Sequence, residues 1–530
     1  MQTCFESHKA CRFQRNPQKA LPKRLLDISE LSKGHVRLWE LGKDEHKPEN
    51  DSYACLSYCW GQRPFLKTTK SSLDAHLTRI PLTDLPRIFQ DAISVTQRLG
   101  LRYLWIDSLC IVQDDDDEWR QIAAQMASIY QNSHFVISAI SAPDVHNSLY
   151  GSPDAIHRSS EVPIGYGGGV DTSILCRCYA THLPGLLDGI GRREDSLPAL
   201  GRGWIFQERL LAPRTIYFGP QEITWECLEA SNCQCLQDEP ERKHKWKAYA
   251  PWLDAGSLGS FSITKKVVNP RLLSSWNQQT IRRCWHRLVE EYSKLELSYE
   301  LDILPALCGI AALLEPFQGS AYLAGLWEDS LFQDLLWHSE RSGQGPTATA
   351  RPAQWRAPSW SWASLKHPVK FVDTTGGLEP LCILIEASCE PVNGAQRMGQ
   401  LASGYLALQG KLISTILHCL LSEDGNIELP NRYTLEIVRG RVCNTWIDVD
   451  PSRAKSTHIS EQEVYCFPIG IKSASGALEC LLLKALSATD EVGGQNHTFE
   501  RIGMLELPKQ SLRGLSSWTD HEHTQVVRLI

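Results

Sequence analysis

The sequence predicts an α/β protein with a mostly parallel sheet as its core, a helical elaboration and a β-rich C-terminal region. Apolar runs of strand length alternate with helical patterns over residues 53–140, as in a parallel sheet covered by helices on both faces. Residues 275–340 show helical periodicity. Beyond residue 366, apolar and polar residues alternate, which is typical of strands.

The core elements can be placed from apolar spacing and stop signals. Ile88, Phe89 and Ala92 recur at helical spacing, and Gly100 follows where a left-handed residue would end that helix. We expect the strands at 54–58 and 103–106 to end at Tyr58 and Asp107 and to face one cleft. The expected elements are strand 54–58, helix 87–99, strand 103–106, helix 118–131 and strand 134–140.

The flanking segments are less regular. Residues 1–50 contain one expected strand at 35–41, and residues 143–200 are rich in Gly, Pro, Ser and Asp, which predicts an insertion with loops. Two further strands are expected at 216–218 and 223–226. No repeat of 20–50 residues is present, which argues against a solenoid or propeller.

Composition excludes several classes of protein. The 530 residues are 42% hydrophobic and 22% charged, as in an ordinary globular protein, and the net charge of −7 gives no footprint for nucleic acid. The longest apolar run, 303–314, is too short for a bilayer span, and the basic N-terminal stretch lacks the apolar core of a signal peptide. We therefore expect a cytoplasmic protein with no membrane span and no nucleic-acid partner.

Eighteen cysteines are scattered along the chain, several of them inside apolar runs. Two groups invite a metal interpretation: Cys227, Cys233 and Cys235, and Cys4, His8 and Cys11. Neither group has paired C-x-x-C spacing, so the sequence favours reduced structural thiols over a metal. No phosphate-binding loop, G-x-G-x-x-G or H-E-x-x-H occurs, so we expect no cofactor.

Four blocks occur in a fixed order: YACLSYCWG at 53–61, LRYLWIDSLCIVQDDDDEW at the start of 101–139, RGWIFQERLLAPRTIYFGPQEITWEC at 202–227, and RAPSWSWASL at 356–365. Together they resemble the fungal heterokaryon-incompatibility (HET) family, which is distantly similar to Toll/interleukin-receptor (TIR) domains with a flavodoxin-like core. This chain would be a divergent member.

The resemblance implies a domain organisation. A variable segment at 1–50 would precede a HET-like domain at 51–365 and a β-rich C-terminal domain at 366–530. The HET-like domain would comprise the α/β core, the insertion and the helical part described above.

One position departs from the family. Members commonly carry a glutamate one helical turn after the tryptophan that corresponds to Trp119, and in NAD-cleaving TIR domains that carboxylate is catalytic. Here the matching residue is Ile122, which can neither stabilise positive charge nor accept a proton. The neighbouring Gln121 lies about 100° around the helix. The acids at 114–118 could substitute, although such a run is usually a solvated helix start. We therefore expect no NAD hydrolysis.

The predicted catalytic residues are Asp107, Arg202, Gln207 and Glu208. Asp107 ends an apolar strand, where α/β proteins place binding sites, but it could equally cap the following loop. An Arg–Glu pair in RGWIFQERL could orient a substrate through a fork of donors. The alternative is an internal salt-bridge network.

Seventeen tryptophans are present, many of them inside the four blocks. In Gly- or Pro-flanked turns their rings could line a pocket, whereas elsewhere they would pack in the core. The predicted substrate-binding residues are Trp60, Trp105, Trp119, Trp204, Trp360 and Trp362.

Two functions follow. The first is a cofactor-independent cyclase of fungal natural-product biosynthesis, acting on an apolar terpenoid or polyketide by a Diels–Alder-type reaction. Such chemistry depends on folding the substrate and requires few titrating groups. The alternative is a heterokaryon-incompatibility or cell-death effector that acts through protein partners, with residual NAD-directed activity as an option.

Overall fold

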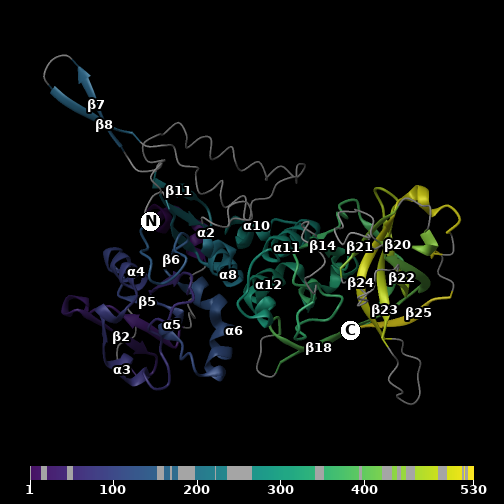
Figure 1. Ribbon diagram of the computed structural model, residues 1–530, viewed down its shortest axis with the longest axis horizontal. Coiled ribbons are helices and arrows are strands. Elements are labelled where there is room, and N and C mark those ends of the chain that lie inside the picture. Colours follow the sequence, from purple (N-terminus) through teal and green to yellow (C-terminus); the bar gives the residue numbers. More distant parts are fainter. Residues whose placement is uncertain are drawn as a thin grey trace. The chain divides into compact units, whose positions relative to one another are not determined.

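A computed structural model describes most of the chain. The described residues are 2–13, 21–43, 52–151, 160–166, 170–176, 197–220, 222–234, 265–340, 351–392, 397–419, 433–438, 443–448, 460–486, 498–515, 518–519 and 523–530. They form two compact units, Met1–Ser275 and Trp276–Ile530 (Figure 1). The helical segment at 275–340 thus belongs spatially with the C-terminal strands, whereas the family domain limits at 51–365 and 366–530 stay predictions.

The first unit is built on a nine-stranded sheet with the order β11-β10-β9-β6-β3-β5-β1-β2-β4. Its four central strands, β9-β6-β3-β5, are parallel to one another. The strands are β1 Arg24–Asp27, β2 His35–Glu40, β3 Ala54–Ser57, β4 Ile80–Pro81, β5 Tyr103–Trp105, β6 Phe135–Ser138, β9 Arg214–Phe218, β10 Ile223–Cys227 and β11 Ser231–Cys233.

The sheet as a whole is mixed, whereas its core strands over residues 53–140, β3, β5 and β6, are parallel as predicted. β1, β2 and β4 extend one side in antiparallel pairs, and β10 and β11 extend the other in the same way. The reason lies in the connections: short links such as the one between β9 and β10 permit only antiparallel neighbours, whereas parallel neighbours need a crossover. Neighbouring strands of this sheet are parallel where a connection containing a helix joins them along the chain.

Two helices complete the core of this unit, as the sequence predicts. Helix α4 Arg87–Arg98 connects β3 to β5, and helix α6 Asp116–Asn132 precedes β6 (Figure 1). The two connections run in opposite directions along the sheet, so right-handed crossovers place the helices on opposite faces. Both bury an apolar stripe against the strands. Gly100 has φ +78°, the left-handed conformation expected after α4.

The remaining elements of the first unit are short, apart from helix α8. Within the expected insertion, β7 Ser160–Tyr166 and β8 Val170–Cys176 form an antiparallel hairpin. The motif at 202–211 forms α8 and leads into β9. The helices are α1 Gln2–Ser7, α2 Lys9–Phe13, α3 Leu73–Thr78, α5 Asp107–Cys110, α8 Gly203–Leu211 and α10 Pro270–Leu273, with 3-10 turns at Leu31–Lys33, Leu82–Asp84, Pro198–Gly201 and Lys265–Val268.

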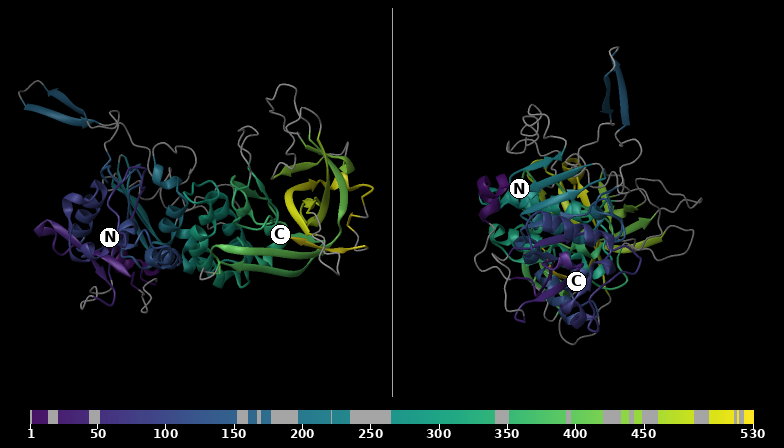
Figure 2. Two further views of the ribbon diagram at one scale, coloured as in Figure 1. Left: turned by 60° about the horizontal axis from the view of Figure 1, so that its bottom comes forward. Right: turned by 90° about the vertical axis from the view of Figure 1, so that its left-hand side faces the viewer.

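The second unit combines helices with a ten-stranded sheet, as the β-rich prediction requires. The main path of the sheet is β17-β18-β25-β24-β23-β22-β19-β20, with β16 paired to β22 and β21 to β24. The left view of Figure 2 shows the long pair β17–β18 as green ribbons. The strands are β16 Leu378–Pro380, β17 Ile383–Pro391, β18 Leu401–Gly410, β19 Ile413–Cys419, β20 Tyr433–Leu435, β21 Asn444–Ile447, β22 Ser460–Lys472, β23 Leu478–Ala485, β24 Thr498–Leu507 and β25 Gln525–Leu529.

The helical part of this unit agrees only partly with the prediction. Two helices occur where periodicity predicts them, α11 Gln278–Tyr292 and α12 Pro305–Gln318, whereas residues 326–339 fold mainly into short strands around a single helical turn. These shorter elements are β12 Tyr322–Leu323, β13 Leu326–Trp327, α13 Leu331–Asp334, β14 Trp337–Ser339 and β15 Val369–Phe371, with 3-10 turns at Glu300–Ile303, Glu328–Ser330, Trp362–Ser364, Glu436–Val438 and Lys509–Leu512. No helix in the described residues is long and apolar enough to cross a membrane.

Candidate functional site

Asp107 is the centre of a polar network at the carboxyl ends of β3 and β5. Its Oδ1 accepts hydrogen bonds from the Tyr58 hydroxyl (2.7 Å) and the Ser108 backbone N–H (2.6 Å), and its Oδ2 accepts one from Trp60 Nε1 (2.8 Å). The Tyr58 oxygen also lies 2.9 Å from Ser108 Oγ. Strand ends Tyr58 and Asp107 therefore meet, as predicted, because β3 and β5 are adjacent and parallel.

The loop that carries Trp60 is held by the loop that follows β6. Gly61 has φ +73°, and a Cβ at this position would lie 2.3 Å from Cβ of Asp144, so only glycine fits. Arg63 donates to Asp144 Oδ2 at 2.7 Å. The YCWG motif thus fixes the Trp60 indole against Asp107.

Glu208 is a second buried carboxyl group near Asp107. Helix α8 places it beside the end of β3, where it is 7% exposed. Burial raises its pKa to about 7, the hydroxyls of Ser57 and Tyr130 lower it in part, and the charge of Asp107 raises it. Neither Glu208 Oε2 nor Ser57 Oγ makes a well-formed hydrogen bond to the described residues. The group is therefore a carboxyl that exchanges protons near neutral pH.

Arg202 supplies positive charge to this site. It lies close enough to Cys59, Asp107 and Glu208 to lower the pKa of each. Burial has the larger effect and raises the pKa of all three groups. For Asp107 and Cys59 the net pKa shift is upward. At Asp107 the hydrogen bonds from Tyr58 and Trp60 also lower the pKa, but not enough to reverse the effect of burial. Two carboxyl groups and one guanidinium can hold one shared proton, or one cationic or hydrogen-bonding group of a ligand.

A comparison with models of protein families gives a match in this part of the chain. The family model described as "Heterokaryon incompatibility protein (HET)" matches residues 53–208. The chain therefore contains a HET domain at residues 53–208. Searches among curated proteins and among solved structures found no significant match. The matched range begins just before β3 and ends at Glu208, so the HET domain includes Asp107, Arg202 and Glu208.

The predicted catalytic residues of the HET domain are therefore neighbours in part. Asp107, Arg202 and Glu208 influence one another electrostatically, and Gln207 is a buried residue of helix α8, 1% exposed. Ser57, Ser108 and Tyr130 also line the network, and the sequence analysis did not single them out. Ser57 is the polar last residue of the apolar strand β3, and Asp107 lies just beyond the end of β5, so a polar residue at the end of an apolar strand was the available signal at both positions.

The predicted substrate-binding tryptophans have different environments. Trp60 and Trp204 are half-buried beside the core of the HET domain, and Trp119 is 37% exposed on α6. Trp105 is 1% exposed, against Tyr130 in the core. Trp360 and Trp362 lie in the other unit, where both are fully buried. The placement of these last three favours core packing, because their rings have no free surface for a ligand.

Ile122 lies in the core of the HET domain. It is 4% exposed and belongs to the apolar core around the sheet, so the position that the resemblance matches to a glutamate holds a core residue here. No carboxylate from the preceding acidic run takes its place. Asp114 accepts from the Lys70 backbone N–H, and Asp115 caps α6 by accepting from the Glu118 N–H.

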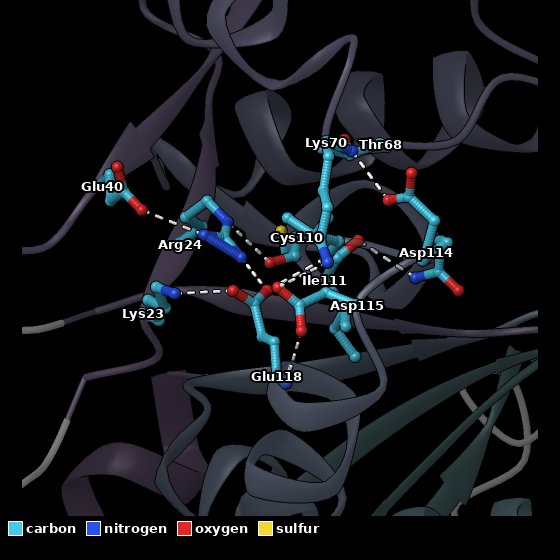
Figure 3. A network of polar contacts seen from close by, with 12 residues as sticks. Lys23, Arg24, Glu40, Thr68, Lys70, Cys110, Ile111, Asp114, Asp115 and Glu118 are labelled. Atoms are coloured by element: carbon cyan, nitrogen blue, oxygen red, sulfur yellow. Dashed lines mark hydrogen bonds and ion pairs between the residues drawn. The ribbon is translucent and has the colours of Figure 1, made fainter.

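Glu118 is committed to an ion-pair network (Figure 3). Arg24 lies between Glu40 and Glu118 and donates to both, and its Nε donates to the Cys110 carbonyl at 3.1 Å. Glu118 also accepts from Lys23 Nζ (2.6 Å) and from the Val112 N–H (3.0 Å). The network joins the start of α6 to β1 and β2, which is a structural role.

A separate group of metal-ligating side chains lies outside the matched range. Cys4, His8 and Cys11 meet Cys227 at the end of β10, with the four potential ligand atoms within 4.8 Å of one another. The two groups that the sequence analysis considered separately thus contribute to a single cluster. Cys235 lies outside the described residues, and the structure does not describe the side chain of Cys233.

Proposed function

We propose that this chain is an effector of heterokaryon incompatibility that acts through a protein partner. The observation that carries the proposal is the HET match at 53–208. It is supported by the site at the carboxyl ends of β3 and β5, because two buried carboxyl groups with raised pKa, Asp107 and Glu208, interact electrostatically there.

We also propose a flavodoxin-like and TIR-like assignment for the parallel part of the sheet. Numbered along the chain, the strands β5-β3-β6-β9 have the order 2-1-3-4, which matches four strands of the flavodoxin-like order 2-1-3-4-5. In such sheets ligands bind beyond the carboxyl ends of the strands where the order reverses, here between β3 and β6. Ser57 and Tyr58 lie at that point.

A cytoplasmic location is part of the proposal. Cys4, Cys11 and Cys227 lie close together without forming a disulfide, which agrees with a reducing compartment. The partner would be a protein, and nothing in the composition points to nucleic acid.

Regulated expression in a filamentous fungus tests the effector function. The wild-type chain, expressed with the partner supplied by an incompatible strain, should arrest growth and reduce viability. Asp107→Asn and Glu208→Gln should each restore growth, because they remove one carboxylate and leave the side-chain shape. Asp117→Asn is the matched control, since that side chain is exposed and pairs with the likewise exposed Arg120.

Protein level and circular dichroism of each variant must equal those of the wild type for this comparison. Growth arrest that persists in Asp107→Asn and Glu208→Gln would remove the site from the proposal. Absence of arrest by the wild-type chain in every strain combination would remove the effector function itself.

The cyclase takes second place, although the sequence analysis ranked it first. What still favours it is the half-buried Trp60 beside Asp107 and Arg202, an aromatic face next to hydrogen-bonding groups. The burial of Trp105, Trp360 and Trp362 removes half of its expected aromatic lining.

A direct assay distinguishes the two proposals. The EDTA-treated protein would be incubated, without cofactor, with an uncyclised terpenoid or polyketide intermediate. A cyclase should change the product ratio relative to the spontaneous reaction, and Trp60→Ala should weaken that effect. A ratio identical to the spontaneous one leaves the effector as the sole proposal.

A further inference from the structure

We propose that Cys4, His8, Cys11 and Cys227 form a structural zinc site. The four potential ligand atoms lie within 4.8 Å of one another, whereas ligands around a tetrahedral zinc with Zn–S bonds of about 2.3 Å are separated by about 3.8 Å. Closing on an ion would require shifts of only about 1 Å. The site lies outside the HET match at 53–208 and does not depend on the function proposed for it.

Helical spacing explains how a short segment supplies three ligands. Cys4, His8 and Cys11 are at positions i, i+4 and i+7, so the segment spanning α1 and α2 presents them on one face. Cys227 ends β10 and approaches from the sheet, and His8 Nδ1 lies 3.3 Å from its Sγ. The right view of Figure 2 shows the purple N-terminal helices beside blue-green strands of the first unit.

The surroundings of the sulfurs fit thiolate ligands. Arg214 Nε donates to Cys4 Sγ at 3.2 Å, and the Ala230 backbone N–H donates to Cys227 Sγ at 3.3 Å. Such N–H···S contacts are the outer interactions that orient and stabilise metal-bound ligands. Arg214 is 3% exposed, so its charge offsets the net −1 of a zinc ion with three thiolates in a buried site.

The donor set decides both the metal and its role. Three thiolates and one imidazole form a tetrahedral set that zinc takes in structural sites, whereas Mg²⁺ and Ca²⁺ require oxygen ligands. Four protein ligands leave no open position for water or substrate. Cys4, Cys11 and Cys227 are at most 2% exposed and carry no disulfide, so they are available to the ion and shielded from solvent.

The structural consequence is a cross-link between distant parts of the first unit. Residues His8 and Cys227 are 219 positions apart, and the short helices α1 and α2 would be marginal in isolation. An ion bound by both segments stabilises them because it binds the folded site, where the four ligands meet, and not the unfolded chain.

Metal analysis of the full-length protein tests the site. Wild-type protein produced with zinc in the medium should contain about one zinc per chain, and so should the control Cys55→Ala, a buried cysteine of β3 outside the cluster. Cys227→Ala and His8→Ala should lose zinc, with affinity reduced at least tenfold. After removal of the zinc, Co²⁺ should give thiolate-to-metal absorption in the wild type and the control only.

A second measurement keeps the test decisive if Cys227→Ala folds poorly. Zinc removal from the wild type should lower Tm by roughly 5–10 °C, and added zinc should restore it. Bound zinc should also protect Cys4, Cys11 and Cys227 from alkylation, as mapped by peptide mass spectrometry. Wild-type protein that contains no zinc and gives no Co²⁺–thiolate absorption would overturn the proposal, as would full zinc retention in both ligand variants.

Discussion

Glu208 is the clearest case of a side chain held in an environment that opposes its charge. It is 7% exposed and its pKa is raised to about 7 from an ordinary value of 4.5. Between pH 4.5 and 7 the unfolded chain releases the Glu208 proton while the folded chain retains it. The contribution of this group to stability is therefore fully present below pH 4.5 and is lost as the pH rises to 7.

Glu208→Gln should consequently stabilise the HET domain at pH 8 and change little at pH 4.5. The difference between the two pH values should reach about 3 kcal/mol, because a shift of one pKa unit corresponds to about 1.4 kcal/mol. Urea unfolding of both proteins at several pH values provides the measurement, with Asp117→Asn as an exposed control. A variant equally or less stable than the wild type at pH 8 would show that Glu208 is ionised and well paired in the fold.

The isoleucine at position 122 leads to a prediction about activity toward NAD. The purified protein should not release nicotinamide from NAD, because a core isoleucine occupies the position of the family's glutamate. Ile122→Glu should not create activity and should cost several kcal/mol, since the new carboxylate would be buried without a partner. Nicotinamide release that survives Ile122→Ala and disappears with Asp107→Ala would move the catalytic role to Asp107.

At the scale of elements, the start of α6 depends on a charge network more than on apolar packing. Arg24 is 1% exposed and is the shared partner of Glu40 and Glu118, which come from β2 and α6. Losing it would leave Glu118 and Glu40 with the cationic partners Lys23 and Lys43, whose side chains are about half exposed or more.

Arg24→Met should therefore destabilise the first unit by about 3 kcal/mol, the scale for a buried ion pair that loses one partner. The double variant Arg24→Met/Glu118→Gln should be less unstable than the two single effects added together, because it also removes one of the stranded charges. Arg120→Ala, at an exposed pair with Asp117, should cost less than about 1 kcal/mol. Urea unfolding of the cycle measures the coupling, and strict additivity would contradict it.

The helices and strands also differ in how far the sequence alone predicts them. Local periodicity predicts α4, α6 and the strands around them, because each buries a continuous apolar stripe. It does not predict that β1 and β2 extend the sheet, since that depends on pairing with β5, far along the chain. Asp107 is visible as a polar residue after an apolar strand, whereas the zinc ligands lie in two segments that only the folded sheet brings together.

At the scale of the molecule, each unit has its own apolar core and its own buried charges. In the second unit Arg501 is fully buried. It pairs with Asp448 at 3.1 Å, donates to the Leu335 carbonyl at 2.6 Å and stacks 3.5 Å above the Trp337 ring. One guanidinium thus holds segments that are 53 and more than 160 residues away in sequence.

Arg501→Lys should destabilise the second unit by about 2–4 kcal/mol although it keeps the charge, because an ammonium cannot reproduce a planar fork of donors. Fluorescence and calorimetric unfolding would measure the loss, with Arg528→Lys on the last strand as a comparison. The zinc content of Arg501→Lys should equal that of the wild type, because the metal ligands belong to the first unit. An Arg501→Lys protein as stable as the wild type would show that charge alone suffices.

The separation between His8 and Cys227 also has a consequence for synthesis on the ribosome. At about 5–20 residues per second, the three N-terminal ligands would emerge about 10–40 s before the fourth. During that interval Cys4 and Cys11 are exposed thiols at the N-terminal end of a growing chain, open to oxidation or to capture by other metal ions. Zinc supply should therefore affect the yield of newly made protein more than the behaviour of protein that has already folded.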